Sequence, residues 1–323
     1  MTRYGFGGRL TEAFPSQLNI DLTEVCNLAC IHCSHALMAK SEHYTGAFLP
    51  LELNKKAVDE VRDFGKGSCE YIRYTGAGEP FLHKDLFSIL KYAVDNSGVT
   101  VTLTANGTLI NEEKAKRFLD TGTNLIDISI DAFLSETYAR IRVNGNLEVT
   151  RRNILRLIEL KRQFNYSTKI VVSYIEQPGN MAETERFEEF WKQAGVDFVV
   201  IRRCHSNCGS LEGRARELRE KNAEQKRTPC IYPWERIALR SFGALSYCPG
   251  DWVRGSVMAD YRTATIHETW NSEKYRKLRQ AHLDNDYSGF PICSSCPDWS
   301  QVRWPEEGRA YANMIEDFNH KDS

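Results

Sequence analysis

Short apolar segments rich in β-branched residues alternate with helical patterns along the first 200 residues, and this alternation constrains the fold more than any other feature. The strand-like segments lie at 17–23, 70–76, 99–105, 125–131, 169–175 and 197–203. Apolar residues at three- and four-residue steps mark helices near 50–64, 85–96, 111–120, 148–164 and 183–194. Six βα units predict a parallel α/β sheet with right-handed crossovers, either closed as a complete or partial barrel or left open. Ligands of such a sheet bind at the carboxyl ends of the strands.

The alternation stops after about residue 205, so we expect one main domain and an appendage. We assign residues 1–16 to an N-terminal extension and 17–210 to the barrel. Residues 211–229 are a charged helical connector, in which acidic and basic residues are mixed as on a solvated helix face. Residues 230–300 form a second module, and residues 301–323 are a C-terminal tail.

Ten cysteines are the unusual part of the composition. The chain shows no signal-peptide core and no apolar run of membrane-spanning length, so we expect a reducing cytoplasm, where clustered cysteines bind metals. A formal net charge of −1 gives no electrostatic reason to bind nucleic acid or an anionic membrane.

Three of the cysteines follow the first predicted strand closely. Cys26, Cys30 and Cys33 form a C-x3-C-x2-C pattern. Three thiolates leave one iron of a four-iron cluster open to another ligand. The alternative is a zinc site in which His32 or His35 supplies the fourth ligand.

The three-cysteine motif resembles that of the radical S-adenosylmethionine (radical SAM) superfamily. The resemblance implies a partial (β/α)6 barrel and a [4Fe-4S] cluster whose open iron binds SAM and drives its reductive cleavage to a 5'-deoxyadenosyl radical. The segment YTGAGEP resembles the family's Gly-Gly-Glu-Pro signature, with Ala77 replacing a glycine. This likeness makes Gly76, Gly78, Glu79 and Pro80 candidates for binding SAM, with Glu79 as a charged partner or an internal brace.

Polar residues that end the third and fourth predicted strands extend the resemblance. Thr104 and Asn106 in TANGT, and Ser129 in DISIDAF, resemble residues of the family's SAM pocket. Asp131 follows Ser129 on the same face of the strand. In ETYARIRVNG, the resemblance implies that Arg142 contacts the SAM carboxylate, and Arg140 is the alternative.

A second group of cysteines lies in the C-terminal module. Cys230 and Cys248 flank a stretch that contains Gly243, and Cys293 and Cys296 follow as C-x2-C. This order resembles the auxiliary-cluster module SPASM, or its shortened form Twitch, because Cys296 is the last cysteine. The spacing is most similar to that of 2-deoxy-scyllo-inosamine dehydrogenase, which oxidises an aminocyclitol alcohol. The resemblance implies one auxiliary [4Fe-4S] cluster with four thiolate ligands, and structural zinc is the alternative.

Three cysteines remain, and two of them follow the sixth predicted strand. Cys204 or Cys208 is a candidate hydrogen-atom donor, or an unreactive small residue, whereas we expect Cys69 to be buried. Arg202, Arg203, His205 and Asn207 are candidates for binding or deprotonating the substrate. Residues beside the second cysteine group are further candidates that either bind substrate or shield the cluster: Asp251, Trp252, Arg254, Asp298 and Trp299.

The reaction we expect is oxidation of an alcohol of a sugar or aminocyclitol, with the auxiliary cluster accepting an electron. Epimerisation of a sugar, aminoglycoside or peptide, with a cysteine as hydrogen-atom donor, is the first alternative, and a non-catalytic metal-binding scaffold is the second. We expect a flavodoxin or ferredoxin as electron donor and a small-molecule substrate, nucleosides included. A leader-dependent peptide is disfavoured because only about sixteen residues precede the first predicted strand.

Overall fold

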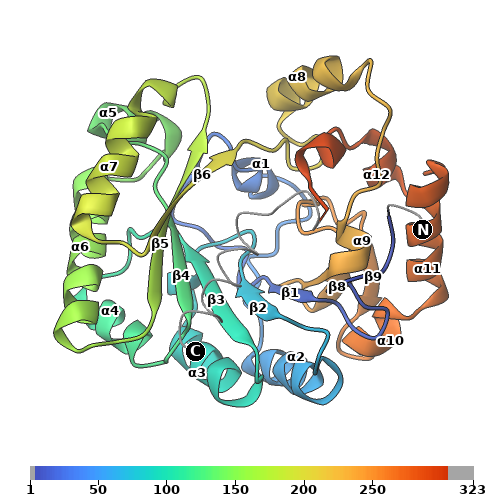
Figure 1. The fold of residues 1–323 in the computed structure, drawn as a ribbon, viewed down its shortest axis with the longest axis horizontal. Helices are drawn as coiled ribbons and strands as arrows, with labels where there is room; N and C mark the ends of the chain where they lie inside the picture. Colours follow the sequence, from blue (N-terminus) through green and yellow to red (C-terminus); the bar gives the residue numbers. More distant parts are fainter. Residues whose placement is uncertain (1–3, 305–323) are drawn as a thin grey trace.

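A curved sheet, parallel from residue 17 to residue 239 and antiparallel at its C-terminal edge, forms the framework of the molecule, which a computed structural model describes from residue 4 to residue 304 (Figure 1). Its order is β6-β5-β4-β3-β2-β1-β7-β8-β9. The six strands predicted from the sequence are all present: β1 (Gln17–Ile20), β2 (Tyr71–Tyr74), β3 (Thr100–Ala105), β4 (Leu125–Ser129), β5 (Lys169–Glu176) and β6 (Phe198–Arg203). Since β6 is an edge strand, the barrel is partial, as predicted.

Helices cover the outer face of this sheet (Figure 1). They are α2 (Leu51–Phe64), α3 (Leu86–Asn96), α4 (Glu112–Leu119), α5 (Ser135–Ile141), α6 (Leu147–Gln163) and α7 (Thr184–Ala194). Asn111 and Asn146 cap α4 and α6, because each side chain accepts a hydrogen bond from a backbone amide of the first turn. Short helical turns occur at α1 (His35–Met38), η1 (Pro80–Leu82), η2 (Met181–Glu183) and η3 (Asp298–Gln301). No helix within residues 4–304 is long and apolar enough to cross a membrane.

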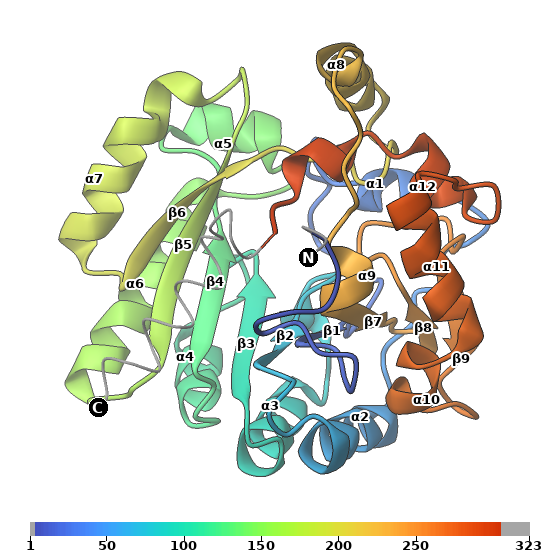
Figure 2. The same cartoon turned by 45° about the vertical axis from the view of Figure 1, so that its right-hand side comes forward.

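The C-terminal part begins with α8 (Glu212–Asn222), the predicted charged connector, which stands away from the sheet in Figure 2. The elements that follow are α9 (Tyr232–Glu235), β7 (Arg236–Leu239), β8 (Ala244–Ser246), β9 (Val257–Asp260), α10 (Ile266–Trp270), α11 (Glu273–Asp284) and α12 (Pro291–Ser295). The C-terminal module continues the sheet of the barrel, because β7 pairs in parallel with β1 over its whole length. The βα alternation of the sequence ends before β7, so the sequence pattern did not predict this pairing.

The inner face of the barrel changes from apolar to polar along the strands. Tyr71, Leu125, Val171 and Val200 form a small buried cluster near the amino-terminal ends. Two residues further along β4, Asp127 is buried and pairs with Arg202 of β6 at 2.5 Å. The polar layer, which contains Asp127 and Arg202, therefore lies between the apolar cluster and the carboxyl ends of the strands, on the side of the C-terminal module.

Candidate functional site

The loop that carries Cys26, Cys30 and Cys33 leaves β1 and is fixed to the end of α5. The backbone amide of Ala29 donates to the carbonyl of Val143 at 3.0 Å, and that of Ile31 donates to Ile141 at 3.0 Å. Backbone amides also point at sulfur, since Leu28 N lies 3.5 Å from Cys26 Sγ and His35 N lies 3.5 Å from Cys33 Sγ. The loop therefore presents its thiols together.

The thiols of this loop are held where thiolate charge is disfavoured. Burial raises the pKa of Cys26 to about 12, and the neighbouring Glu79, Cys30 and Cys33 add to the rise. Burial likewise raises the pKa of Cys30 and Cys33. Three such thiols ionise together only beside positive charge, which a bound iron cluster supplies. The donor set thus fits the cluster that the sequence predicts.

Both ring nitrogens of His32 have polar partners, whereas His35 Nδ1 has no hydrogen-bond partner within residues 4–304. The His35 ring nitrogen Nε2 bonds the carbonyl of Glu24 at 2.8 Å. His32 Nε2 lies 3.2 Å from Asp131, and its Nδ1 lies 3.4 Å from the Gln177 amide. Burial lowers the pKa of His32 to about 4, so its ring is neutral. These contacts disfavour His32 as the fourth ligand of a zinc site.

The segment Gly76–Pro80 packs against the cysteine loop more closely than side chains permit. A Cβ on Gly78 would lie 2.4 Å from the carbonyl oxygens of Thr23 and Val25. A Cβ on Gly76 would lie 2.2 Å from the Asp21 carboxylate. The two glycines are therefore required by close approach.

Glu79 acts as an internal brace, one of the two roles predicted for it. Its carboxylate accepts backbone hydrogen bonds from Phe81 at 3.1 Å and Asn106 at 2.8 Å. Pro80 follows as the first residue of η1. The Asn106 side chain bonds Asn27 at 2.9 Å, which ties the third strand end to the cysteine loop. The sequence analysis did not identify Asn27. Its place between Cys26 and Cys30 is the one signal that could have indicated it.

Arg142 is placed at the first cysteine group, and Arg140 is exposed. The Arg142 guanidinium is buried, lies 3.6 Å from Cys30 Sγ and forms an ion pair with Asp131. Asp131 has a left-handed backbone, with φ of 64°, and its other oxygen accepts from the amide of Ile175 at 2.6 Å. Both charged groups therefore have partners beside the cluster ligands.

The two hydroxyl candidates occupy different depths of the barrel. Thr104 Oγ1 lies 3.4 Å from the Arg73 guanidinium, in the polar layer with Asp127. Ser129 Oγ lies 3.3 Å from Ser173 Oγ on the neighbouring strand. Thr104 is level with Asp127, so Ser129 lies two register positions nearer to the carboxyl ends of the strands.

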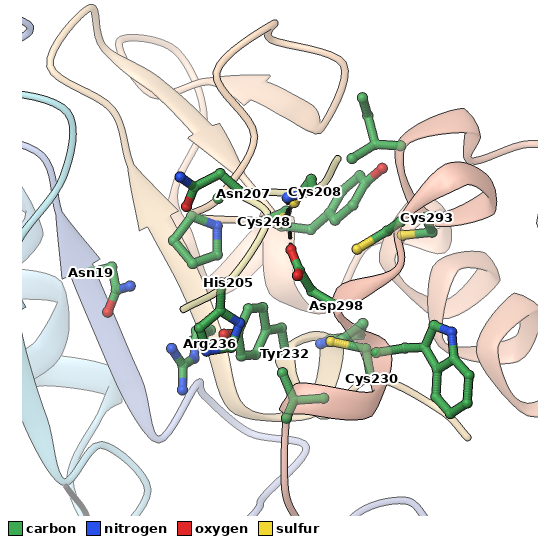
Figure 3. A pocket seen from close by; sticks show the side chains of 18 of the residues that line it. Asn19, His205, Asn207, Cys208, Cys230, Tyr232, Arg236, Cys248, Cys293 and Asp298 are labelled. Atoms are coloured by element: carbon green, nitrogen blue, oxygen red, sulfur yellow. Dashed lines mark hydrogen bonds between the residues drawn. The ribbon is translucent and has the colours of Figure 1, made fainter. Parts of the chain in front are cut away.

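A cavity of about 280 Å³ joins the barrel to the second cysteine group (Figure 3). Its barrel side includes Asn19, Arg73, Thr75 and Gly76. Its opposite side carries the four cysteines that the sequence assigns to an auxiliary cluster: Cys230, Cys248, Cys293 and Cys296. Burial raises the pKa of Cys293 to about 12. This thiol therefore ionises only when positive charge, such as that of bound iron, lies beside it.

The structure separates Cys204 from Cys208, which we expected to share the substrate mouth. Cys208 lines the same cavity as the four cysteines, and its Sγ lies 3.2 Å from that of Cys248. Cys204 instead lines a second cavity, of about 650 Å³, beside Ile31 and His32 of the cluster loop. The backbone is left-handed at Asn207 and Cys208, a local conformation that the sequence spacing did not reveal. Cys69 is buried, as expected.

The other candidate substrate-binding residues at the end of β6 lie at different sites. His205 and Asn207 line the first cavity, and Arg203 lines the second. Burial lowers the pKa of His205, so its ring is neutral near neutral pH. Arg202 lies in the polar layer of the barrel, paired with Asp127.

Residues after Cys248 and Cys296 have mixed roles. Trp252 lines the first cavity and packs with Met38 and Ala77, and its indole Nε1 has no hydrogen-bond partner within residues 4–304. Asp251 accepts backbone hydrogen bonds within its own loop, from Val253 and Ser256. Arg254 donates a hydrogen bond to Glu24 of the first cysteine loop, and Asp298 accepts one from the backbone amide of Cys208. Trp299 lines the first cavity.

Comparison with known proteins agrees with this organisation. A family described as the Radical SAM superfamily matches residues 20–187, and the SPASM iron-sulfur cluster-binding domain matches residues 230–297. A probable GTP 3',8-cyclase of Methanococcus maripaludis is 32% identical over 186 residues, covering 56% of this chain and 57% of the relative. An AdoMet-dependent heme synthase of Methanosarcina barkeri is 30% identical over 183 residues, covering 56% and 48%. The matches thus span only about half the length of these relatives.

Solved structures share the fold at low sequence identity. BtrN in complex with AdoMet and 2-DOIA has a TM-score of 0.59 at 14% identity, over 88% of this chain and 93% of BtrN. Streptococcus suis SuiB bound to precursor peptide SuiA has a TM-score of 0.64 at 12% identity, over 83% and 67%. The protein anSMEcpe with bound AdoMet has a TM-score of 0.58 at 18% identity, over 83% of each chain.

Proposed function

Because this chain belongs to the radical SAM superfamily, we propose that it oxidises an alcohol of a sugar or aminocyclitol to a ketone. Its cofactors are SAM and [4Fe-4S] clusters, as the two domain matches indicate. Cys26, Cys30 and Cys33 would hold the first cluster, which together with SAM would supply the radical chemistry that removes a hydrogen atom from a substrate carbon. The side chains around the site determine which substrate binds and how the substrate radical reacts after the hydrogen atom has been removed.

The observation that carries this proposal is the single cavity shared by the barrel and the second cysteine group. Conversion of an alcohol to a ketone, after loss of one hydrogen atom from carbon, still requires loss of one proton and one electron. Cys248 and Cys293 line the cavity opposite Asn19 and Arg73 of the barrel. A cluster held by the cysteines is therefore next to the substrate, in the position an electron acceptor needs.

Side chains of the cavity suit a hydroxyl-bearing substrate. Asn19, Thr75 and Asn207 provide neutral polar groups that can donate and accept hydrogen bonds. His205 is our candidate for accepting the proton, because burial keeps its ring neutral near neutral pH. The dehydrogenase whose cysteine spacing this chain resembles, structurally represented by BtrN, supports an aminocyclitol as the first compound to test.

An anaerobic assay tests the reaction type. Candidate sugars, aminocyclitols and peptides are incubated with reduced enzyme and SAM in D2O, and 5'-deoxyadenosine is measured against product. We expect one 5'-deoxyadenosine per product and a product lighter than the substrate by two hydrogens. A product of unchanged composition that carries deuterium on carbon would overturn oxidation in favour of epimerisation.

Epimerisation is the second candidate, because one observation favours it. Cys204 lies in the second cavity beside Ile31 and His32, so its thiol is near the first cluster loop and apart from the auxiliary cysteines. If Cys204 is the hydrogen-atom donor, Cys204→Ala abolishes solvent deuterium incorporation while 5'-deoxyadenosine still forms. Cys69→Ala, a buried thiol outside both cavities, is the matched control. A variant with undiminished deuterium incorporation would exclude this role for Cys204.

A further inference from the structure

Five thiols, one more than a [4Fe-4S] cluster needs, line the cavity at the second cysteine group (Figure 3). Four of them belong to the spacing pattern that predicts the auxiliary cluster, and Cys208 is the fifth. It precedes Cys230 by 22 positions and comes from the loop after β6. A role for Cys208 here rests on the auxiliary cluster and not on the alcohol oxidation proposed for the enzyme.

Cys208 lies against two members of the set, Cys248 and Cys296. Its Sγ lies 3.2 Å from Cys248 Sγ. Its sulfur, the sulfur of Cys296 and a carboxylate oxygen of Asp298 all lie within 4.8 Å of one another. A Cβ on Gly250 would lie 3.1 Å from Cys208 Sγ, so the glycine leaves room for this sulfur. The thiol is therefore inside the ligand group.

The loop around Cys208 is built to hold it there. The Asp298 carboxylate accepts from the backbone amides of Ser206 at 2.8 Å and Cys208 at 2.9 Å. Asn207 and Cys208 both have left-handed backbones, with φ of 51° and 58°. This conformation is unfavourable for residues with a Cβ and persists only where surrounding contacts enforce it. Since Asp298 follows Cys296 by two residues, the brace links Cys208 to the C-x2-C segment.

Geometry limits how Cys208 and Cys248 can share one cluster. Thiolates on two irons of a four-iron cube point to separate corners, whereas these two sulfurs are in contact. We propose that Cys208 and Cys248 are alternative ligands of one auxiliary-cluster iron, so that either thiolate completes the set with Cys230, Cys293 and Cys296. The thiol that is off the iron remains in the cavity as a free thiol.

Iron content tests the proposal independently of activity. In a background with Cys26, Cys30 and Cys33 changed to alanine, anaerobically reconstituted protein should hold about four irons per chain, as one cluster requires. We expect Cys208→Ala and Cys248→Ala each to keep that iron, and the double variant to lose it. Cys230→Ala is the matched control and should lose its iron. Far-UV circular dichroism confirms that each variant is folded.

Alkylation of the unmutated holoprotein gives a second readout that no folding defect affects. Anaerobic iodoacetamide treatment followed by peptide mapping should label Cys208 and Cys248 each in part, with Cys230 protected. Complete labelling of one of the two thiols with none of the other would overturn the proposal. The proposal would also be overturned if Cys208→Ala or Cys248→Ala held as little iron per chain as Cys230→Ala. Iron retention by the double variant would overturn it as well.

Discussion

Arg254 of the C-terminal module donates a hydrogen bond to Glu24 of the first cysteine loop at 3.2 Å, across 230 residues of sequence. The other oxygen of Glu24 accepts from Thr45 and Ala47, so one buried carboxylate joins three segments. The C-terminal module therefore stabilises the loop that carries Cys26, Cys30 and Cys33.

Replacing Arg254 with alanine tests this link. The change leaves the buried Glu24 carboxylate without its cation, and hydrogen bonds to charged groups contribute about 1.5–3 kcal/mol. We expect a loss of about 2 kcal/mol in the free energy of unfolding of the anaerobic holoprotein, measured by urea denaturation. Arg262→Ala is the control, because its pair with Asp260 is exposed and such pairs contribute about 0–1 kcal/mol. Equal losses in the two variants would argue against the link.

Arg142→Met tests the buried ion pair beside Cys30. Removing the guanidinium leaves Asp131, which is fully buried, as an uncompensated charge. Breaking such a pair costs about 3–5 kcal/mol of stability. The exposed Arg140→Met should change stability by less than about 0.5 kcal/mol. Urea denaturation of both variants measures the difference, and an Arg142→Met protein as stable as Arg140→Met would contradict the importance of this ion pair.

The raised pKa of Asp21 leads us to expect an unusual pH dependence of the free energy of unfolding. Burial raises the pKa of this carboxyl from 3.8 to about 6, and one of its oxygens has no hydrogen-bond partner within residues 4–304. Between these two values the unfolded chain releases the Asp21 proton before the folded protein does. The contribution of this group to stability is therefore fully present below pH 3.8 and is lost as the pH rises through 6.

Asp21→Asn removes this titration and keeps an oxygen to accept from the Ala77 amide. Compared with the unaltered protein, the variant should gain stability as the pH rises, by up to about 3 kcal/mol above pH 6. Thermal denaturation from pH 4 to pH 8 measures the difference. Asp95→Asn, on an exposed carboxylate of α3, should show no such rise. A stability difference between Asp21→Asn and the unaltered protein that does not vary with pH would contradict the raised pKa.

The sequence predicted elements whose residues repeat with a clear period and missed relationships that depend on short or strained segments. The six barrel strands and the helices between them follow from alternating apolar patterns. By contrast, β7 lies beyond the βα alternation, and its pairing with β1 has no local signature. The place of Cys208 depends on two successive left-handed residues and on Asp298, which lies 90 positions away. Such long-range contacts are not encoded in spacing alone.

Gly78 offers the sharpest test of the fit between the glycine-rich segment and the cysteine loop. A Cβ at this position would lie 2.4 Å from two backbone carbonyl oxygens, which cannot rotate away as a flexible side chain does. Gly78→Ala should therefore force the segment away from Thr23 and Val25, with a loss of about 3 kcal/mol or more in stability and weaker retention of the first cluster. Gly213→Ala in α8 is the matched control, because nothing lies within 4 Å of its added Cβ and alanine favours the helix by about 1 kcal/mol. Urea denaturation and iron content of both variants measure the effect, and a Gly78→Ala protein as stable as Gly213→Ala would show that the segment shifts without cost.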